Sequence, residues 1–161
     1  MGAIVLIDAS VYLNLLALPG FDQEREEILK QFERMVGEGD HFLLPMATIW
    51  QSGNHIADLP DSGRRREYAL KFANEVGAAL RGDMPWKATS FPERERLEAW
   101  LSEYPSYIQQ DKSPGQTREG VSLADLSVIK EWEMLCDRHP MSRVRIWALD
   151  THLRGYDRTH G

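Results

Sequence analysis

Cysteine is nearly absent from this chain, and long apolar runs are missing altogether. The 161 residues include one cysteine, which cannot form a disulfide within the chain and favours a reducing compartment. No apolar run approaches the roughly 18 residues of a membrane-spanning helix. The first apolar stretch, residues 3–7, lacks the basic start and the length of a signal peptide. We therefore expect a cytoplasmic protein without a membrane segment.

Several motifs of common enzyme classes are also missing. The chain has no Gly-x-Gly-x-x-Gly and no Walker A loop, the usual phosphate cradles for dinucleotides and nucleoside triphosphates. It has no Cys-x-x-Cys pair for zinc and no Gly-x-Ser-x-Gly nucleophile elbow. The net charge of −6 argues against binding nucleic acid by bulk attraction, although local basic clusters remain.

The length and the hydrophobic pattern predict a single α/β domain over residues 1–161. Continuous apolar runs at residues 3–7, 41–44 and 144–149 predict strands that are buried on both faces. The apolar spacing predicts helices at residues 10–18, 22–37, 48–59, 62–80, 93–103 and 122–137. Ser10 is expected to be the N-cap of the first of these helices. Strands separated by helices, with no hairpin signal, predict three α/β/α layers around a central parallel sheet.

Two segments between these helices have little apolar periodicity. Residues 86–90 read as a short extended piece. Residues 105–119 read as irregular, with an exposed loop at Asp-Lys-Ser-Pro-Gly-Gln-Thr.

Three aspartates fall where a parallel sheet gathers its functional groups. Asp8 ends the first strand, Asp150 ends the last, and Asp125 lies in the first turn of the helix that Ser122 begins. Strand ends and helix starts meet at the carboxyl edge of such a sheet. Two unit charges about 4 Å apart repel by about 4 kcal/mol at an effective dielectric near 20. Mg²⁺ or Mn²⁺, which prefer oxygen ligands, would remove that repulsion.

Four short motifs carry a family resemblance. They are Ile-Val-Leu-Ile-Asp-Ala-Ser-Val-Tyr-Leu ending at residue 13, Gln-Ser-Gly-Asn-His-Ile from Gln51, Ser-Leu-Ala-Asp-Leu-Ser-Val-Ile from Ser122, and Ile-Trp-Ala-Leu-Asp-Thr-His-Leu ending at residue 153. Their order and spacing resemble the PIN domain family, and in particular the VapC-type toxin ribonucleases. The resemblance covers essentially the whole chain. Residues 82–119 form a longer segment than a minimal PIN domain needs.

The resemblance implies a metal-dependent ribonuclease that leaves 5′-phosphate and 3′-hydroxyl ends, forms a homodimer and pairs with an antitoxin protein. It implies that Asp8, Asp125 and Asp150 hold Mg²⁺ or Mn²⁺ and carry catalysis, with Ser10 as an accompanying hydroxyl. The chain departs from the family at Gln51, where the second acidic residue is usually glutamate. It also has Ala148 where threonine or serine is common two residues before the last aspartate.

Structural roles compete with these assignments. Ser122-x-x-Asp125 and Thr48-x-x-Gln51 are both capping-box patterns, and for Gln51 we favour the cap. Asn54 shares a helix face with Gln51 and could approach the site, although an ordinary polar position is the simpler interpretation. Other acids could replace the missing one, with no spacing that favours any of them: Asp58, Glu131 and Asp157. The five tryptophans are more typical of a core than of base-stacking platforms.

Basic residues gather in two places. One is a cluster of three consecutive arginines and the other lies near the end of the chain, and both could hold an RNA backbone without reading its sequence: Arg64, Arg65 and Arg66, and Arg143, Arg145 and Arg154. Three functional hypotheses follow. The first is an active ribonuclease, the second a degenerate PIN domain that binds RNA or protein without cutting, and the third another acidic α/β domain of the phosphoryl-transfer or receiver kind.

Overall fold

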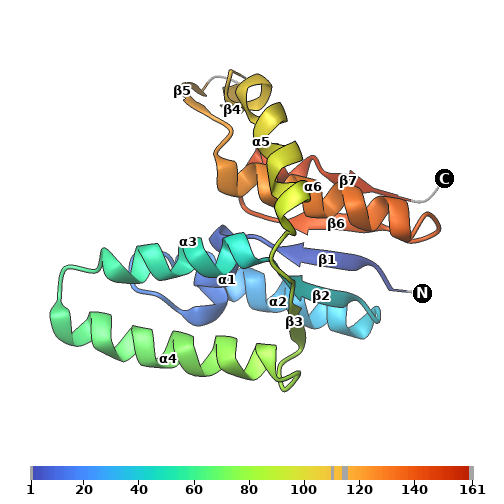
Figure 1. The fold of residues 1–161 in the computed structure, drawn as a ribbon. Coiled ribbons are helices and arrows are strands. Elements are labelled where there is room, and N and C mark those ends of the chain that lie inside the picture. The colour runs from blue at the N-terminus through green and yellow to red at the C-terminus, as the bar shows by residue number, and fades with distance from the viewer. Residues whose placement is uncertain (1, 110, 114–115, 160–161) are drawn as a thin grey trace.

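Strands and helices alternate along most of the computed structural model of this chain (Figure 1). The structure describes residues 2–109, 111–113 and 116–159. The strands are β1 (Ile4–Ile7), β2 (His41–Leu44), β3 (Trp86–Ala88), β4 (Asp111–Ser113), β5 (Gln116–Gly120), β6 (Val144–Trp147) and β7 (Asp157–Arg158). The helices are α1 (Ala9–Leu16), α2 (Arg25–Gly37), α3 (Met46–Ala57), α4 (Ser62–Leu80), α5 (Arg94–Ile108), α6 (Leu123–Arg138) and α7 (Thr151–Arg154).

The central sheet has five strands in the order β3-β2-β1-β6-β7. Its first four strands are parallel, with Ile4 of β1 opposite His41 of β2 on one side and Val144 of β6 on the other. The short β7 pairs antiparallel with β6 at the edge, which the sequence pattern did not predict. The predicted parallel sheet is therefore confirmed for four strands.

Strand β1 lies at the centre of two hydrophobic cores. Its side chains alternate between the faces, so Val5 and Ile7 join one cluster with residues of α1, α2 and α4. Leu6 joins the other cluster with residues of α6 and α7. All three side chains are fully buried. The helices thus cover both faces of the sheet, and the fold is a three-layer α/β/α arrangement (Figure 1).

The prediction of irregular structure at residues 105–119 is wrong. Helix α5 continues through Pro105 to Ile108, and its last turn is held by Tyr107, which packs against the cluster that contains Leu6. Strands β4 and β5 then form an antiparallel hairpin of their own. The two residues between them, 114 and 115, lie outside the described part of the chain, but their Pro-Gly sequence is a turn signal.

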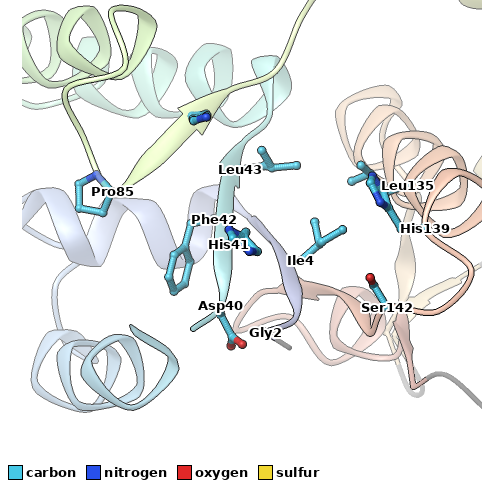
Figure 2. A pocket seen from close by; sticks show the side chains of 11 residues that line it. Gly2, Ile4, Asp40, His41, Phe42, Leu43, Pro85, Leu135, His139 and Ser142 are labelled. Atoms are coloured by element: carbon cyan, nitrogen blue, oxygen red, sulfur yellow. The ribbon is translucent and has the colours of Figure 1, made fainter. Parts of the chain in front are cut away.

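A hollow of about 610 Å³ lies between the sheet and α6. Figure 2 shows His41 and Leu43 of β2 and Ile4 of β1 on one side, and Leu135 and His139 of α6 across from them. None of the three predicted metal-binding aspartates lines it. Among the described residues, no helix combines the length and the apolar character needed to cross a membrane.

Candidate functional site

Asp8 follows β1 directly and begins α1. Its carboxylate accepts a hydrogen bond from the backbone N–H of Ser10 at 3.2 Å and one from the Ser10 hydroxyl at 2.7 Å. The cap of α1 is therefore Asp8, and the prediction that Ser10 caps this helix is wrong. The helix starts one residue earlier because the strand ends at an aspartate, which is itself a strong cap. Asp8 is only 6% exposed.

Ser10 joins the ends of two neighbouring strands. Its hydroxyl donates to Asp8 and accepts the backbone N–H of Leu149, which follows β6, at 3.0 Å. The segment that carries Asp150 is therefore tied to the segment that carries Asp8. This is the position in which the resemblance expects an accompanying hydroxyl.

Asp125 lies in the first turn of α6 and is 3% exposed. Ser122 caps the helix by accepting the backbone N–H of Asp125 at 3.0 Å, as the capping pattern predicts. Burial raises the pKa of Asp8, the hydrogen bonds from Ser10 lower it, and the charge of Asp125 raises it further. The two carboxylates are therefore close enough to repel each other, and they come from different elements.

Asp150 lies at the same edge, three residues beyond the end of β6, and is half-buried. Its carboxylate accepts the backbone N–H of His152 at 2.7 Å and caps the short α7. Nowhere in the described part of the chain do three His, Cys, Asp or Glu side chains gather closely enough to surround a metal ion. The structure thus brings Asp8 and Asp125 together, while Asp150 lies nearby and caps a different helix, α7.

Gln51 lies on α3, above the same edge. Thr48, one turn earlier on the same helix face, donates its hydroxyl to the carbonyl of Ile7 at 2.7 Å and holds α3 against the end of β1. Since α3 begins at Met46 with Pro45 at its cap position, the predicted Thr48–Gln51 capping box is wrong. The Oε1 atom of Gln51 is buried and accepts no hydrogen bond from any described residue.

Two further residues of α3 bear on the sequence predictions. Asn54 is exposed, which agrees with an ordinary polar position. The expectation that the tryptophans belong to the core is wrong for Trp50, which is 60% exposed and lies against Phe91 with ring centroids 5.7 Å apart.

The predicted RNA-contacting arginines are divided among three places. Arg64, Arg65 and Arg66 lie in the first turns of α4, where Arg65 donates to the carbonyl of Leu59 at 2.7 Å. Arg143 and Arg145 lie in or before β6, away from the carboxyl edge, and Arg143 forms an ion pair with Asp157 at 2.7 Å. Arg154 in α7 donates to the carbonyl of Leu149, so it is the one of the six beside Asp150.

A further buried acid, Glu131, lies outside the group formed by Asp8, Asp125 and Asp150. Glu131 of α6 is 8% exposed, and burial raises its pKa to about 7 although a hydrogen bond with the Thr89 side chain lowers it. In the sequence, Glu131 is one of several acids that could replace the missing metal ligand, and no spacing favours it over the others. Its position on a helix was visible, but the cavity beside it is made by residues 89–100, which no local pattern connects to α6.

The chain matches no protein-family model, no curated protein and no solved structure. What supports a function is therefore the geometry of the site together with the four motifs.

Proposed function

We propose that this protein is a Mg²⁺- or Mn²⁺-dependent endoribonuclease that hydrolyses phosphodiester bonds at the carboxyl edge of its sheet. The observation that carries the proposal is the pair of buried carboxylates, Asp8 and Asp125, whose charges repel each other. Buried like charges are costly unless a cation or a proton neutralises them. A divalent cation with oxygen ligands fits this pair.

The donor set agrees with such a cation. Asp8 and Asp125 supply carboxylate oxygens, Gln51 supplies a buried amide oxygen without a hydrogen bond from the described residues, and Asp150 lies at the same edge. The chemistry that a bound Mg²⁺ or Mn²⁺ supplies is polarisation of a phosphate and activation of water for in-line attack on phosphorus. The protein's own part is to orient Asp8 through Ser10 and to hold the RNA backbone, for which Arg154 is the nearest of the predicted arginines.

The residue type at position 51 determines how many acidic side chains the site contains. With glutamate at this position four acids would line the edge, whereas glutamine leaves three and keeps only a neutral oxygen. Fewer anionic ligands weaken divalent-ion binding, so we expect weak metal affinity and one bound ion rather than two. The same substitution favours the second candidate function, a degenerate PIN domain that binds RNA or a protein without cutting.

The test is cleavage of end-labelled, structured RNA with and without Mn²⁺ by the wild type, Asp8→Asn and Gln51→Glu. We expect metal-dependent cleavage that Asp8→Asn reduces by at least 100-fold, because the first metal ligand loses its charge. Asp61→Asn is the matched control, because Asp61 also caps a helix through a backbone N–H two residues later but is exposed. Mn²⁺ should also raise the melting temperature of the wild type and not that of Asp8→Asn.

Each outcome separates the two candidates. A wild type that does not cut, with activity gained in Gln51→Glu, would establish the degenerate scaffold. Cleavage that survives Asp8→Asn would contradict the nuclease site itself.

The toxin role, the antitoxin partner and the homodimer belong to the same proposal and come from the resemblance, whereas the proposed cytoplasmic location comes from the low cysteine content and the apolar pattern. If the chain is a toxin, induced expression of the wild type in a bacterium should arrest growth, and Asp8→Asn should relieve the arrest. Growth arrest that persists in Asp8→Asn would contradict a toxic nuclease.

A further inference from the structure

A cavity of about 340 Å³ lies beside the second half of α6. It lies between the segment that follows β3, helix α5 and helix α6. Its size is that of a small ligand pocket. The lining combines a buried acid, two aromatic side chains and two arginines with a threonine: Glu131, Phe91, Trp100, Arg96, Arg138 and Thr89.

Glu131 gives this cavity its polar centre. The hydroxyl of Thr89 donates to its carboxylate, and the same hydroxyl oxygen accepts the backbone N–H of Met46 at 3.3 Å. The Thr89 hydroxyl, just after β3, therefore links the carboxylate of Glu131 to the start of α3. No ion pair with Glu131 forms within the part of the chain that the structure describes. Burying such a carboxyl costs stability, which is a reason to look for a ligand.

An exposed aromatic pair adjoins the cavity. Trp50 and Phe91 are 60% and 58% exposed, and their rings lie 5.7 Å apart at 45°. Phe91 lines the cavity, whereas Trp50 directly precedes Gln51 in α3. In proteins that bind single-stranded nucleic acid, exposed aromatic side chains serve as stacking platforms for unpaired bases.

The spacing along α6 suits a single strand of RNA. Glu131 lies six residues after Asp125 on this helix, which is about 9 Å along its axis. That length corresponds to two or three stacked nucleotides at about 3.4 Å each. A strand bound at Asp125 would need at least this length to reach Glu131.

We propose that this cavity binds a guanine base of the RNA strand, with Glu131 accepting the guanine N1–H and N2–H₂ groups. Guanine is the base whose Watson–Crick edge presents two adjacent donors, which match the two oxygens of a carboxylate. The other three bases place an acceptor opposite one of those oxygens. Arg96 and Arg138, at the exposed side of the cavity, contact the flanking phosphates.

The inference uses the proposed function only to identify the strand as RNA, since binding the base requires neither the metal nor cleavage. Two guanine donors favour the charged form of Glu131. Binding of guanine should therefore tighten as the pH rises through about 7, the pKa to which burial raises this acid. The charged groups that face it are Arg96, Arg138 and the exposed Glu93, and the arginines keep their charge throughout this range.

The experiment is a binding titration of the four ribonucleoside 5′-monophosphates in EDTA, followed by tryptophan fluorescence. We expect GMP to bind at least tenfold more tightly than AMP, CMP and UMP, and Glu131→Gln to weaken GMP binding by about tenfold or more. Glu98→Gln, an exposed position on α5, is the matched control and should bind as the wild type does. Thermal unfolding of Glu131→Gln verifies that this variant is folded.

The failures of the two proposals are distinguishable. GMP binding that Asp8→Asn leaves intact, in a protein that never cuts RNA, would sustain the guanine site and sink the nuclease. Cleavage in a protein that does not bind GMP at millimolar concentration would do the reverse. Equal affinity for the four nucleotides, preference for another base, or affinity unchanged in Glu131→Gln would overturn the guanine assignment.

Discussion

Asp8 meets two requirements that conflict at neutral pH. It caps α1, which any short side chain with an oxygen acceptor can do, and it carries a charge beside Asp125 in a buried place. The cap needs the oxygen, whereas only metal binding needs the charge. Asparagine separates the two roles because it caps helices about as well as aspartate.

We therefore expect Asp8→Asn to raise the free energy of unfolding in metal-free buffer at pH 7. The gain should be about 0.5–2 kcal/mol, the usual size of single stabilising changes. Because burial and Asp125 raise the pKa of Asp8, wild-type stability from this group is greatest in acid and falls as the pH rises through its folded pKa. The advantage of the variant should thus shrink as the pH falls.

Urea unfolding of the two proteins across the acid and neutral range measures this difference. Asp61→Asn should change stability by less than about 0.5 kcal/mol, as exposed substitutions usually do. An Asp8→Asn protein that is less stable than the wild type at pH 7 would show that Asp8 has a structural role that its charge supports.

Glu131 should make stability depend on pH in the same direction. Its pKa rises from 4.5 to about 7 on folding because the carboxyl is buried. Its contribution to stability is complete below pH 4.5 and is lost as the pH rises to about 7, a change of at most about 3 kcal/mol. Denaturation of the wild type and Glu131→Gln over this range isolates the effect, and the stability of Glu98→Gln should follow the wild type. A constant difference between wild type and Glu131→Gln would mean that Glu131 titrates normally.

Elements that depend on local pattern were predictable from the sequence. Helix α4 has the predicted bounds because its apolar spacing is uninterrupted, and β1 and β2 were visible as continuous apolar runs. The β4–β5 hairpin was missed because its strands are short and polar, so their pairing left no periodic signal. The same limit applies to the end of α5, where contact with a distant cluster holds the last turn beyond Pro105.

The candidate site was predictable in part for the same reason. The positions of Asp8, Asp125 and Asp150 at one edge follow from strand ends and helix starts in a parallel sheet. What each side chain does there depends on contacts between elements. The sequence pattern predicts that Ser10 and Thr48 cap helices. In the structure, Ser10 instead connects the ends of β1 and β6, and Thr48 holds α3 against the end of β1. The cavity around Glu131 joins segments that no single motif contains.

At the scale of the whole molecule, the proposed homodimer is directly measurable. The chain has a mass of 18.5 kDa, so sedimentation equilibrium at micromolar concentration should report twice that value. Several large apolar side chains are exposed on different elements, and the mass measurement tests whether any of them pair with another chain: Leu80, Met141, Leu70 and Val36. A single species at 18.5 kDa would contradict the dimer without affecting the nuclease or the guanine site.

The strand order also governs when the protein can acquire its activity during synthesis. β1 is made first, yet one of its two partners in the sheet, β6, is encoded almost at the other end of the described chain. On the ribosome, Asp8 therefore emerges long before Asp125 and Asp150, and the core around Leu6 cannot close until β6 has left the exit tunnel. A nascent chain from which β6 has not yet emerged would hold an incomplete site, so a ribonuclease of this design would be inactive at that stage of synthesis.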